Sequence, residues 1–257
     1  MLDLDKARIL VTNDDGIHAP GLKVMEKIAK ALAKDVWVVA PEYEQSGASH
    51  SLTLSDPLRV RQVSRRRYAV RGTPTDCVMM GVHELLVDRR PDLILSGVNR
   101  GGNLGEDVTY SGTIAAAMEG TLVKIPSIAL SQSLTTGHPP KWSTAEHHGA
   151  DVVRRLVAAG WHEDVLINVN FPDVVHGSVK GLAVCRQGRR DFKDLAIDAR
   201  VDARGQPYYW LGFRRHEEEH GHDTDLAAVD NGWIAVTPLQ LDLTDTESLK
   251  SLEAGLT

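Results

Sequence analysis

Two adjacent carboxylates, Asp14 and Asp15, follow a run of apolar residues and come directly before Gly16. Adjacent carboxylates repel each other unless a proton or a cation lies between them. At the end of a strand, with a glycine to turn the chain, both can face one ion. Their oxygen atoms favour a hard cation such as Mg²⁺ or Mn²⁺. A second interpretation is that the pair caps a helix beginning near Pro20.

A glycine-rich loop, Gly97–Gly105, carries the polar side chains of Asn99 and Asn103. It leads into Ser111–Thr113, which opens a helix whose free N–H groups could bind phosphate. The alternative is a glycine-rich connector with an ordinary serine cap. The loop lacks the Gly-Lys-Ser/Thr of a Walker loop, and it is not the dinucleotide fingerprint that opens a helix directly after the first strand.

The polar loop Glu42–His50 supplies further hydroxyl groups, among them Ser46 and Ser49. Such a hydroxyl could complete a cation's coordination shell or hold phosphate. A serine nucleophile would need a base, for which His50 and His18 are the candidates. Single histidines in loops are more often exposed polar residues without a catalytic role.

The segment His216–His220 fits the zinc-protease pattern H-E-x-x-H. That pattern requires a helix with one apolar face against the core. Here the flanking residues are polar on every side, so we interpret the segment as a solvated charge run.

The elements that must position these residues alternate between strand and helix. Buried parallel strands read as short β-branched runs, and the helices show apolar residues at helical spacing. This alternation predicts an α/β, Rossmann-like, mostly parallel doubly wound sheet. The three polar loops follow strand ends, so they should face one crevice. Strands are expected at 7–12, 36–40, 58–63, 68–71, 93–95, 128–130 and 165–169, and helices at 20–33, 73–87, 111–123 and 145–159.

The regular alternation of strands and helices ends after Asn170, and short strand-like segments follow at 181–186, 208–213 and 233–237. We interpret them as a C-terminal antiparallel extension that serves oligomer contacts. The chain 1–257 is then one domain, with a Rossmann-like core over 1–170 and the extension over 171–257.

Composition narrows the class of protein. The chain has 257 residues, 42% of them hydrophobic and 25% charged, as in an ordinary globular protein. Its net charge of -6 argues against binding of a nucleic-acid polymer but not against an anionic substrate held through a cation. Neither a signal peptide nor an apolar run of about 18 residues is visible, so a cytoplasmic protein without a membrane partner is expected. Cys77 and Cys185 are expected to be buried free thiols.

Four segments stand out along the chain: Ile9–Gly16, Ala40–Pro41 with Ser46–Ser51, Gly72–Val78, and Ser96–Gly105 with Tyr110–Thr113. Together they resemble the SurE family (survival protein E, the 5'/3'-nucleotidases), and the likeness spans nearly the whole chain. The C-terminal pieces Asp223–Asp225 and Val236–Leu239 also look similar to that family.

The resemblance implies a divalent-metal phosphatase for nucleoside 5'- and 3'-monophosphates, with polyphosphate as a further substrate and a homodimer or homotetramer as the assembly. It implies one Mg²⁺ or Mn²⁺ ion per subunit, with Asp14, Asp15, Ser46 and Asn99 as ligands. The loop around Glu44 and Gln45 departs from the basic residue often found just before that serine, which puts a phosphate contact from position 45, but not the metal, in doubt. The candidate substrate contacts are Asn13, Gly47, Ser49, Asn103, Ser111, Gly112 and Thr113.

Asp14 and Asp15 are also the candidate catalytic residues. In our hypothesis one of them, Asp14 above all, orients or deprotonates an attacking water. A phospho-aspartyl intermediate is the competing route. Two hypotheses from other classes remain: a non-catalytic module that binds and senses nucleotides, and an assembly protein with a vestigial crevice.

Overall fold

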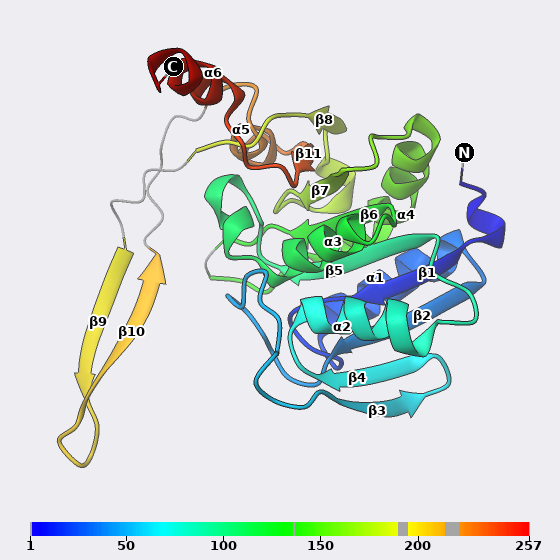
Figure 1. Cartoon of the computed structure of the whole chain (residues 1–257), viewed down its shortest axis with the longest axis horizontal. Coiled ribbons are helices and arrows are strands. Elements are labelled where there is room, and N and C mark those ends of the chain that lie inside the picture. The colour runs from blue at the N-terminus through cyan, green and yellow to red at the C-terminus, as the bar shows by residue number, and fades with distance from the viewer. Residues whose placement is uncertain (1, 136, 190–194, 214–220, 257) are drawn as a thin grey trace.

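A computed structural model describes residues 2–135, 137–189, 195–213 and 221–256. Within these residues, nine strands form the main sheet and two form a separate hairpin (Figure 1). The strands are β1 Arg8–Thr12, β2 Asp35–Pro41, β3 Arg59–Ser64, β4 Arg67–Arg71, β5 Leu93–Arg100, β6 Ser127–Gln132, β7 Val165–Phe171, β8 Leu182–Val184, β9 Leu195–Val201, β10 Pro207–Phe213 and β11 Ile234–Gln240. The helices are α1 Pro20–Leu32, α2 Pro74–Met80, α3 Gly112–Leu122, α4 Trp142–Ala159, α5 Asp225–Asp230 and α6 Thr246–Leu256, with short turns η1 Leu4–Lys6, η2 Gly81–Leu85, η3 Gly105–Thr109 and η4 His176–Ser178.

The main sheet has the order β3-β4-β2-β1-β5-β6-β7-β11-β8. β1 lies between β2 and β5 and is parallel to both. The parallel pairing continues from β2 to β4 and from β5 through β6 to β7. The antiparallel neighbours are β3 with β4 and β7 with β11. This arrangement confirms the predicted mostly parallel α/β sheet.

Helices cover both faces of the sheet, as a doubly wound fold requires. All five residues of β1 are buried. Ile9 and Val11 pack with apolar residues of α1 and α4, whereas Leu10, which points to the other face, packs with α2 and α3. The two sides of one strand therefore belong to two layers of core, which explains why β1 reads as a continuous apolar run.

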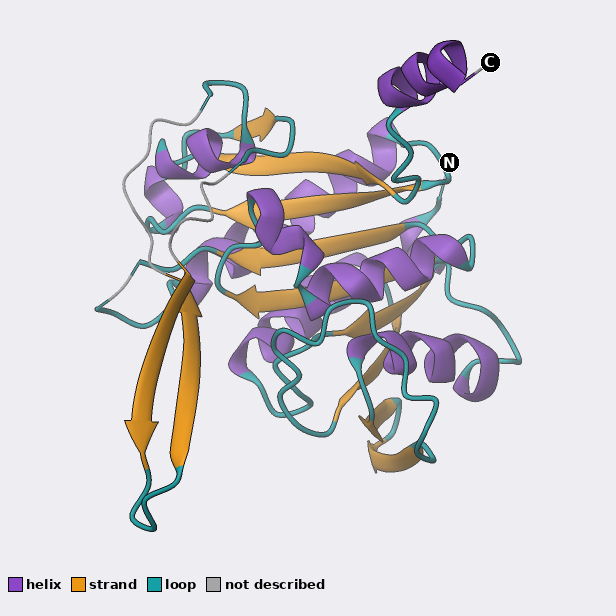
Figure 2. Cartoon of the chain, turned by 60° about the vertical axis from the view of Figure 1, so that its left-hand side comes forward, coloured by secondary structure: helices purple, strands orange, loops and turns teal. Residues whose placement is uncertain are grey.

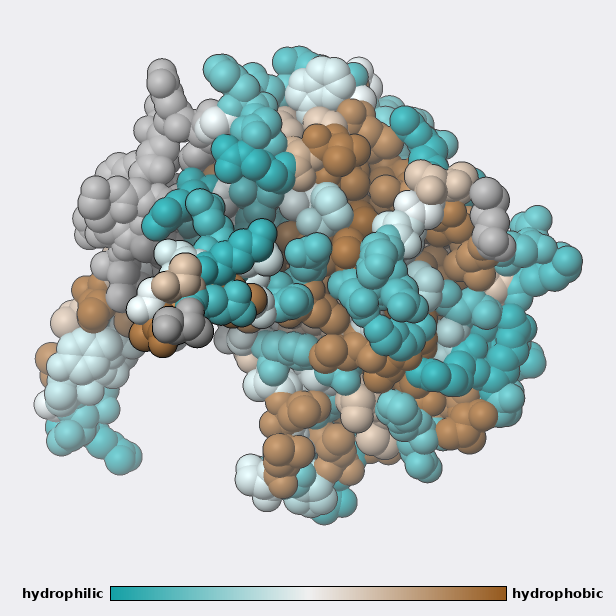
Figure 3. Space-filling model, turned by 45° about the horizontal axis from the view of Figure 1, so that its top comes forward, coloured by the Kyte–Doolittle hydropathy of each residue, from teal (hydrophilic) through white to brown (hydrophobic). Residues whose placement is uncertain are grey.

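The C-terminal region differs in part from the prediction. β8 and β11 do not belong to an extension: β11 pairs antiparallel with β7 and parallel with β8, so both strands continue the main sheet. The prediction that 181–186 and 233–237 belong to the extension was therefore wrong. The first residues of β11 are buried, as expected for a strand inside the main sheet and not for an exposed appendage. β9 and β10 do form the predicted antiparallel pair, which stands away from the body (Figures 2 and 3).

Two further expectations can be compared with the described residues. Cys77 and Cys185 are both free and buried, as predicted. In the ranges covered by the structure, no helix combines the length and the apolar character needed to cross a membrane.

Candidate active site

The candidate site lies where the strand order reverses. β1 and β5 are neighbours, and the chain leaves them toward opposite sides of the sheet. In a doubly wound sheet the carboxyl ends of two such strands leave a crevice where ligands bind. Asp14 and Asp15 follow β1, and Asn99 lies near the end of β5. β5 is longer than predicted, because residues of the glycine-rich loop pair with β6.

Asp14 is buried, with 4% of its surface exposed, and faces the first turn of α3. Its carboxylate accepts hydrogen bonds from the hydroxyl and the backbone amide of Thr113. A Cβ atom at Gly112 would lie 2.8 Å from the Cβ of Asp14, so only glycine allows this approach. The interpretation of the pair as the cap of α1 is wrong, because α1 begins after Ala19 and no side chain makes a capping hydrogen bond there.

The electrostatics of the pair favour an added positive charge. Burial raises the pKa of Asp14 to about 6; the hydrogen bond from Thr113 opposes this rise, and the charge of Asp15 adds to it. Burial also raises the pKa of Asp15, against a hydrogen bond from the Arg100 amide, while the charge of Glu44 raises it further. Charged forms that are disfavoured in this way would be stabilised by a bound cation.

The loop after β2 lies against Asp14. The backbone amide of Gln45 donates to the Asp14 carbonyl oxygen over 2.8 Å. Ser46 is exposed, and its hydroxyl donates to the Glu44 carboxylate over 2.9 Å. Ser49 is held from the other side, because its hydroxyl donates to the Thr109 carbonyl oxygen over 2.7 Å. This loop therefore connects Asp14 with the segment before α3, and it includes the exposed Gly47.

His50 does not activate a serine in this arrangement. Its Nε2 atom lies 3.0 Å from the carboxylate of Glu119, a buried residue of α3. The hydroxyl groups of Ser46 and Ser49 donate to other acceptors. His18 is exposed. The geometry thus gives no support to a serine nucleophile with a histidine base.

The glycine-rich loop brings the two asparagines to different surroundings. Asn99 donates through its side-chain nitrogen to the Gly101 carbonyl oxygen over 2.9 Å, which leaves its side-chain oxygen as the atom suited to a cation. Asn103 is buried and anchors the loop: its side-chain nitrogen donates to Ser131 over 2.8 Å, and its carbonyl oxygen accepts from Asn168 over 2.8 Å. A substrate contact from Asn103 would have to use its remaining polar atoms.

Two more predicted contacts lie beside the pair. Asn13 is fully buried and donates to the Gly16 carbonyl oxygen over 3.1 Å, but its side-chain oxygen has no hydrogen-bond partner in the chain. A buried polar atom without a partner is uncommon and indicates a missing ligand or water. The Ser111 hydroxyl accepts from the Ile114 amide over 3.1 Å as the cap of α3.

The predicted ligands are of the residue types that suit a hard cation. Asp14, Asp15, Ser46 and Asn99 offer carboxylate, hydroxyl and amide oxygens, the ligands that Mg²⁺ and Mn²⁺ prefer. Among the residues that the structure describes, no cluster of three or more His, Cys, Asp or Glu side chains is suited to a metal. The predicted ligand set contains only two such residues, Asp14 and Asp15, and therefore does not meet this criterion. The pattern His216–His220 lies outside the described residues.

Sequence reasoning missed several residues that act near the site. Thr113 was predicted as a phosphate contact but not as the partner of Asp14. Glu44 was given no role of its own, yet its negative charge raises the pKa of Asp15. Glu119 was not considered, although a buried glutamate in an otherwise alanine-rich helix is a signal for a polar partner.

Comparisons with known proteins agree with this fold and with the predicted family. Residues 9–194, more than half of the chain, match the family described as "Survival protein SurE". The 5'-nucleotidase SurE of Parvibaculum lavamentivorans is 60% identical over 251 residues, covering 97% of this chain and 91% of the relative. The protein of the same name from Paramagnetospirillum magneticum is 59% identical over 253 residues, covering 98% and 97%.

A solved structure is similar over almost its full length. The crystal structure of the SurE protein from Aquifex aeolicus superposes with a TM-score of 0.82 at 40% sequence identity, covering 97% of this chain and 100% of that one. The family match, the close relatives and the shared fold together confirm the resemblance read from the sequence. The chain belongs to the SurE family.

Proposed function

We propose that this protein is a divalent-metal-dependent 5'-nucleotidase that hydrolyses nucleoside monophosphates to nucleoside and phosphate. The observation that carries the proposal is the buried carboxylate of Asp14, set beside Asp15 and against the start of α3 where β1 and β5 diverge. Relatives that are about 60% identical over nearly the whole chain are named 5'-nucleotidase. Activity toward 3'-monophosphates and polyphosphate, in a cytoplasmic homodimer or homotetramer, completes the proposal.

One Mg²⁺ or Mn²⁺ ion per subunit would be held by Asp14, Asp15, Ser46 and Asn99. When bound, the ion supplies Lewis-acid polarisation of the phosphoryl oxygens. The raised pKa values of both carboxylates and the all-oxygen donor set support this assignment.

The chain's own groups bind the substrate phosphate. The start of α3 lies next to Asp14 at Gly112, and the N-terminus of a helix favours a bound anion. The Thr113 amide donates to Asp14 in this structure, so in the proposal it turns to the phosphate only when the Asp14 carboxylate binds the cation. The fixed dipoles of the first α3 amides also stabilise negative charge that grows on the phosphoryl group during hydrolysis. The remaining substrate contacts in the proposal are Asn13, Gly47, Ser49, Asn103 and Ser111.

Asp14 orients the attacking water and takes its proton. Its carboxylate is mostly ionised at neutral pH, because its pKa is about 6 without metal and a bound cation would favour the charged form further, so it can accept a proton. In the competing route Asp14 attacks the phosphorus itself. Trapping of a covalent phosphoenzyme would replace the water route by that one.

A phosphate-release screen tests the proposal. Nucleoside 5'- and 3'-monophosphates and polyphosphate are incubated with the protein and Mg²⁺, Mn²⁺ or a chelator. We expect metal-dependent phosphate release that the chelator abolishes. Nucleotide binding without any release would favour the rival function of a non-catalytic sensing module, and neither binding nor release would favour the vestigial crevice.

A further inference from the structure

Two short segments, one before and one after the hairpin of β9 and β10 in the sequence, contact each other on the body: residues 186–188 and 223–225, which we call the base of the hairpin. The Arg186 amide donates to the Asp223 carbonyl oxygen over 3.1 Å, and the Asp225 amide donates to the Arg186 carbonyl oxygen over 3.0 Å. The Gly188 amide donates to Oδ1 of Asp225 over 2.8 Å. The two sides of the base are therefore joined to each other.

The same base holds one residue of the candidate site, Gly105, at the end of the glycine-rich loop. The Gly105 amide donates to Oδ2 of Asp225 over 3.0 Å. Its carbonyl oxygen accepts from Nε2 of Gln187 over 2.9 Å. Asp225 is fully buried, so its carboxylate depends on these backbone donors. Both backbone polar groups of Gly105 are thus bound by side chains of the base.

Gly105 is connected in turn to the loop that carries Ser46. It begins η3, whose last residue, Thr109, accepts the hydrogen bond from the Ser49 hydroxyl. The next carbonyl oxygen, of Tyr110, accepts from the Ser49 amide over 3.2 Å. Ser49 lies three residues after Ser46, so hydrogen bonds, joined by the short backbone stretches 105–109 and 46–49, connect the base to the proposed cation ligand.

We propose that Gln187 and Asp225 are positioning residues, which hold η3 and the Ser46 loop in the conformation that binds cation and phosphate. This inference rests on the proposed function. If the contacts to Gly105 are lost, the loops occupy more conformations, and binding must select the competent one. The loss then appears in the binding constants, whereas turnover at saturation recovers because the ligand itself orders the loops.

The variant Gln187→Glu tests this role, because it keeps the size of the side chain and removes the donor to Gly105. Gln187 is exposed, so the change leaves the core intact. Gln206→Glu, in the turn of the hairpin, is the matched control. Three quantities are measured in the full-length protein: hydrogen exchange of residues 105–110, Mn²⁺ affinity by direct titration, and phosphate release from AMP.

For Gln187→Glu we expect faster exchange in residues 105–110 and a rise in the Mn²⁺ dissociation constant and in KM of about three- to tenfold, the effect of one lost hydrogen bond. The kcat at saturating Mn²⁺ and AMP should stay within about twofold, and Gln206→Glu should match the wild type. Gln187→Ala, which only deletes the contact, should behave in the same direction.

Unchanged exchange and unchanged Mn²⁺ affinity in both Gln187 variants would overturn the proposal. A fall in kcat with unchanged binding constants would also overturn it, because the residue would then act on the chemical step. Failure of the proposed function looks different: the wild type would release no phosphate, while the exchange and Mn²⁺ measurements would still decide the role of Gln187.

Discussion

At the scale of single residues, the environment of Asp14 sets two effects against each other. Burial disfavours the charged carboxylate, whereas the hydroxyl and amide of Thr113, at the positive end of α3, favour it. The pKa of about 6 means that burial prevails in the metal-free chain. A carboxylate kept in this state costs stability, and a bound cation would recover that cost. The position of Asp14 is therefore better explained by ligand binding than by structure alone.

Replacement of Asp14 by asparagine should abolish the proposed activity. Asp14→Asn keeps the shape of the side chain but removes one negative charge from the cation site, so we expect Mn²⁺ binding to be lost and phosphate release to fall at least about 100-fold. Asp151→Asn, at an exposed position of α4, is the control. Wild-type turnover in Asp14→Asn would refute the assignment.

The pKa of Asp14 also predicts how the stability of the metal-free protein depends on pH. Because the folded pKa of about 6 exceeds the unfolded value of 3.8, the folded state binds the proton more tightly. The free energy of unfolding therefore falls as pH rises from about 4 to about 6, by about 3 kcal/mol for this group. This change can be measured by urea unfolding at pH 4.5 and 7.5 in the presence of a chelator, with the wild type and Asp14→Asn compared at each pH. A difference between the two proteins that does not change with pH would contradict this prediction.

Gly112 is predicted to be irreplaceable for a steric reason. In Gly112→Ala the new methyl group would lie 2.8 Å from Cβ of Asp14 and 3.0 Å from Cγ of Pro74, so α3 and Asp14 must move apart. We expect a loss of about 1–3 kcal/mol of stability and a marked fall in turnover. Gly177→Ala is the control, since a Cβ atom there meets nothing within 4 Å. Equal activity of the two variants would show that the contact with Asp14 is not critical.

At the scale of elements, the sequence predicted what depends on local pattern. β1 and α1 were predicted because a buried parallel strand and an amphipathic helix have clear periodicities. Because ligands bind at the carboxyl ends of strands in such sheets, the three polar loops were predicted to face one crevice. The far end of β5 was missed, because glycine and asparagine favour loops, and only pairing with β6 makes that segment a strand.

Placement that depends on distant partners could not be predicted. β11 belongs to the main sheet because it pairs with β7 and β8. Its own residues do not specify those neighbours, so this placement could not be predicted from them. The role of Asn103 was beyond reach for the same reason: its partners Ser131 and Asn168 come from β6 and β7. The sequence was enough to predict which residue types form the candidate site. Their hydrogen-bond partners could be identified only from the folded structure.

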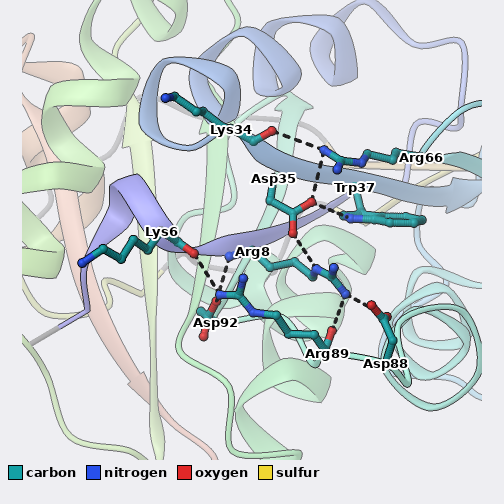
Figure 4. A network of polar contacts seen from close by, with 9 residues as sticks. All are labelled: Lys6, Arg8, Lys34, Asp35, Trp37, Arg66, Asp88, Arg89 and Asp92. Atoms are coloured by element: carbon teal, nitrogen blue, oxygen red, sulfur yellow. Dashed lines mark hydrogen bonds and ion pairs between the residues drawn. The ribbon is translucent and has the colours of Figure 1, made fainter.

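The amino end of β1 carries a polar network that should support stability and not the site (Figure 4). The Arg8 guanidinium, largely buried, donates to Asp35 over 2.8 Å, to Asp88 over 2.9 Å and to the Arg89 carbonyl oxygen over 2.7 Å. It also lies over the ring of Trp37, 5.5 Å from its centre. Its partners belong to β2 and to the segment before β5, so the network ties three neighbouring parts of the sheet together.

Arg8→Met should cost about 2 kcal/mol of unfolding free energy, because Asp35 and the Arg89 carbonyl oxygen lose a charged donor. The loss is no larger because Asp35 keeps Arg66 and the Trp37 ring nitrogen as partners, and Asp88 is exposed. Mn²⁺ affinity and turnover should remain within about twofold of the wild type, since β1 separates Arg8 from the site by about 15 Å. Urea unfolding and phosphate release check both statements. Arg59→Met, an exposed arginine of β3, is the control. A large loss of activity in folded Arg8→Met would mean that the two ends of β1 are coupled.

At the scale of the whole molecule, the hairpin presents two unlike faces. Residues paired across β9 and β10 share a face, so Ile197 lies beside Leu211, and Val201 lies on the same side. All three are exposed, by 60% to 71%. The opposite face carries the ion pair of Asp198 with Arg200 together with the exposed rings of Tyr208 and Trp210. An isolated two-stranded hairpin is marginally stable in water, so its apolar face requires a cover.

In the proposed homodimer or homotetramer, a second copy of the chain provides this cover. Ile197→Ser combined with Leu211→Ser should therefore shift the assembly toward the monomer, because apolar area buried between copies is lost. Sedimentation measures the mass at several protein concentrations. The matched control changes the other face, Asp198→Ser with Arg200→Ser, and should keep the wild-type mass. An unchanged mass in the apolar variant would place the contacts elsewhere, whereas a monomer that still binds Mn²⁺ would show that the site at β1 and β5 is complete within one chain.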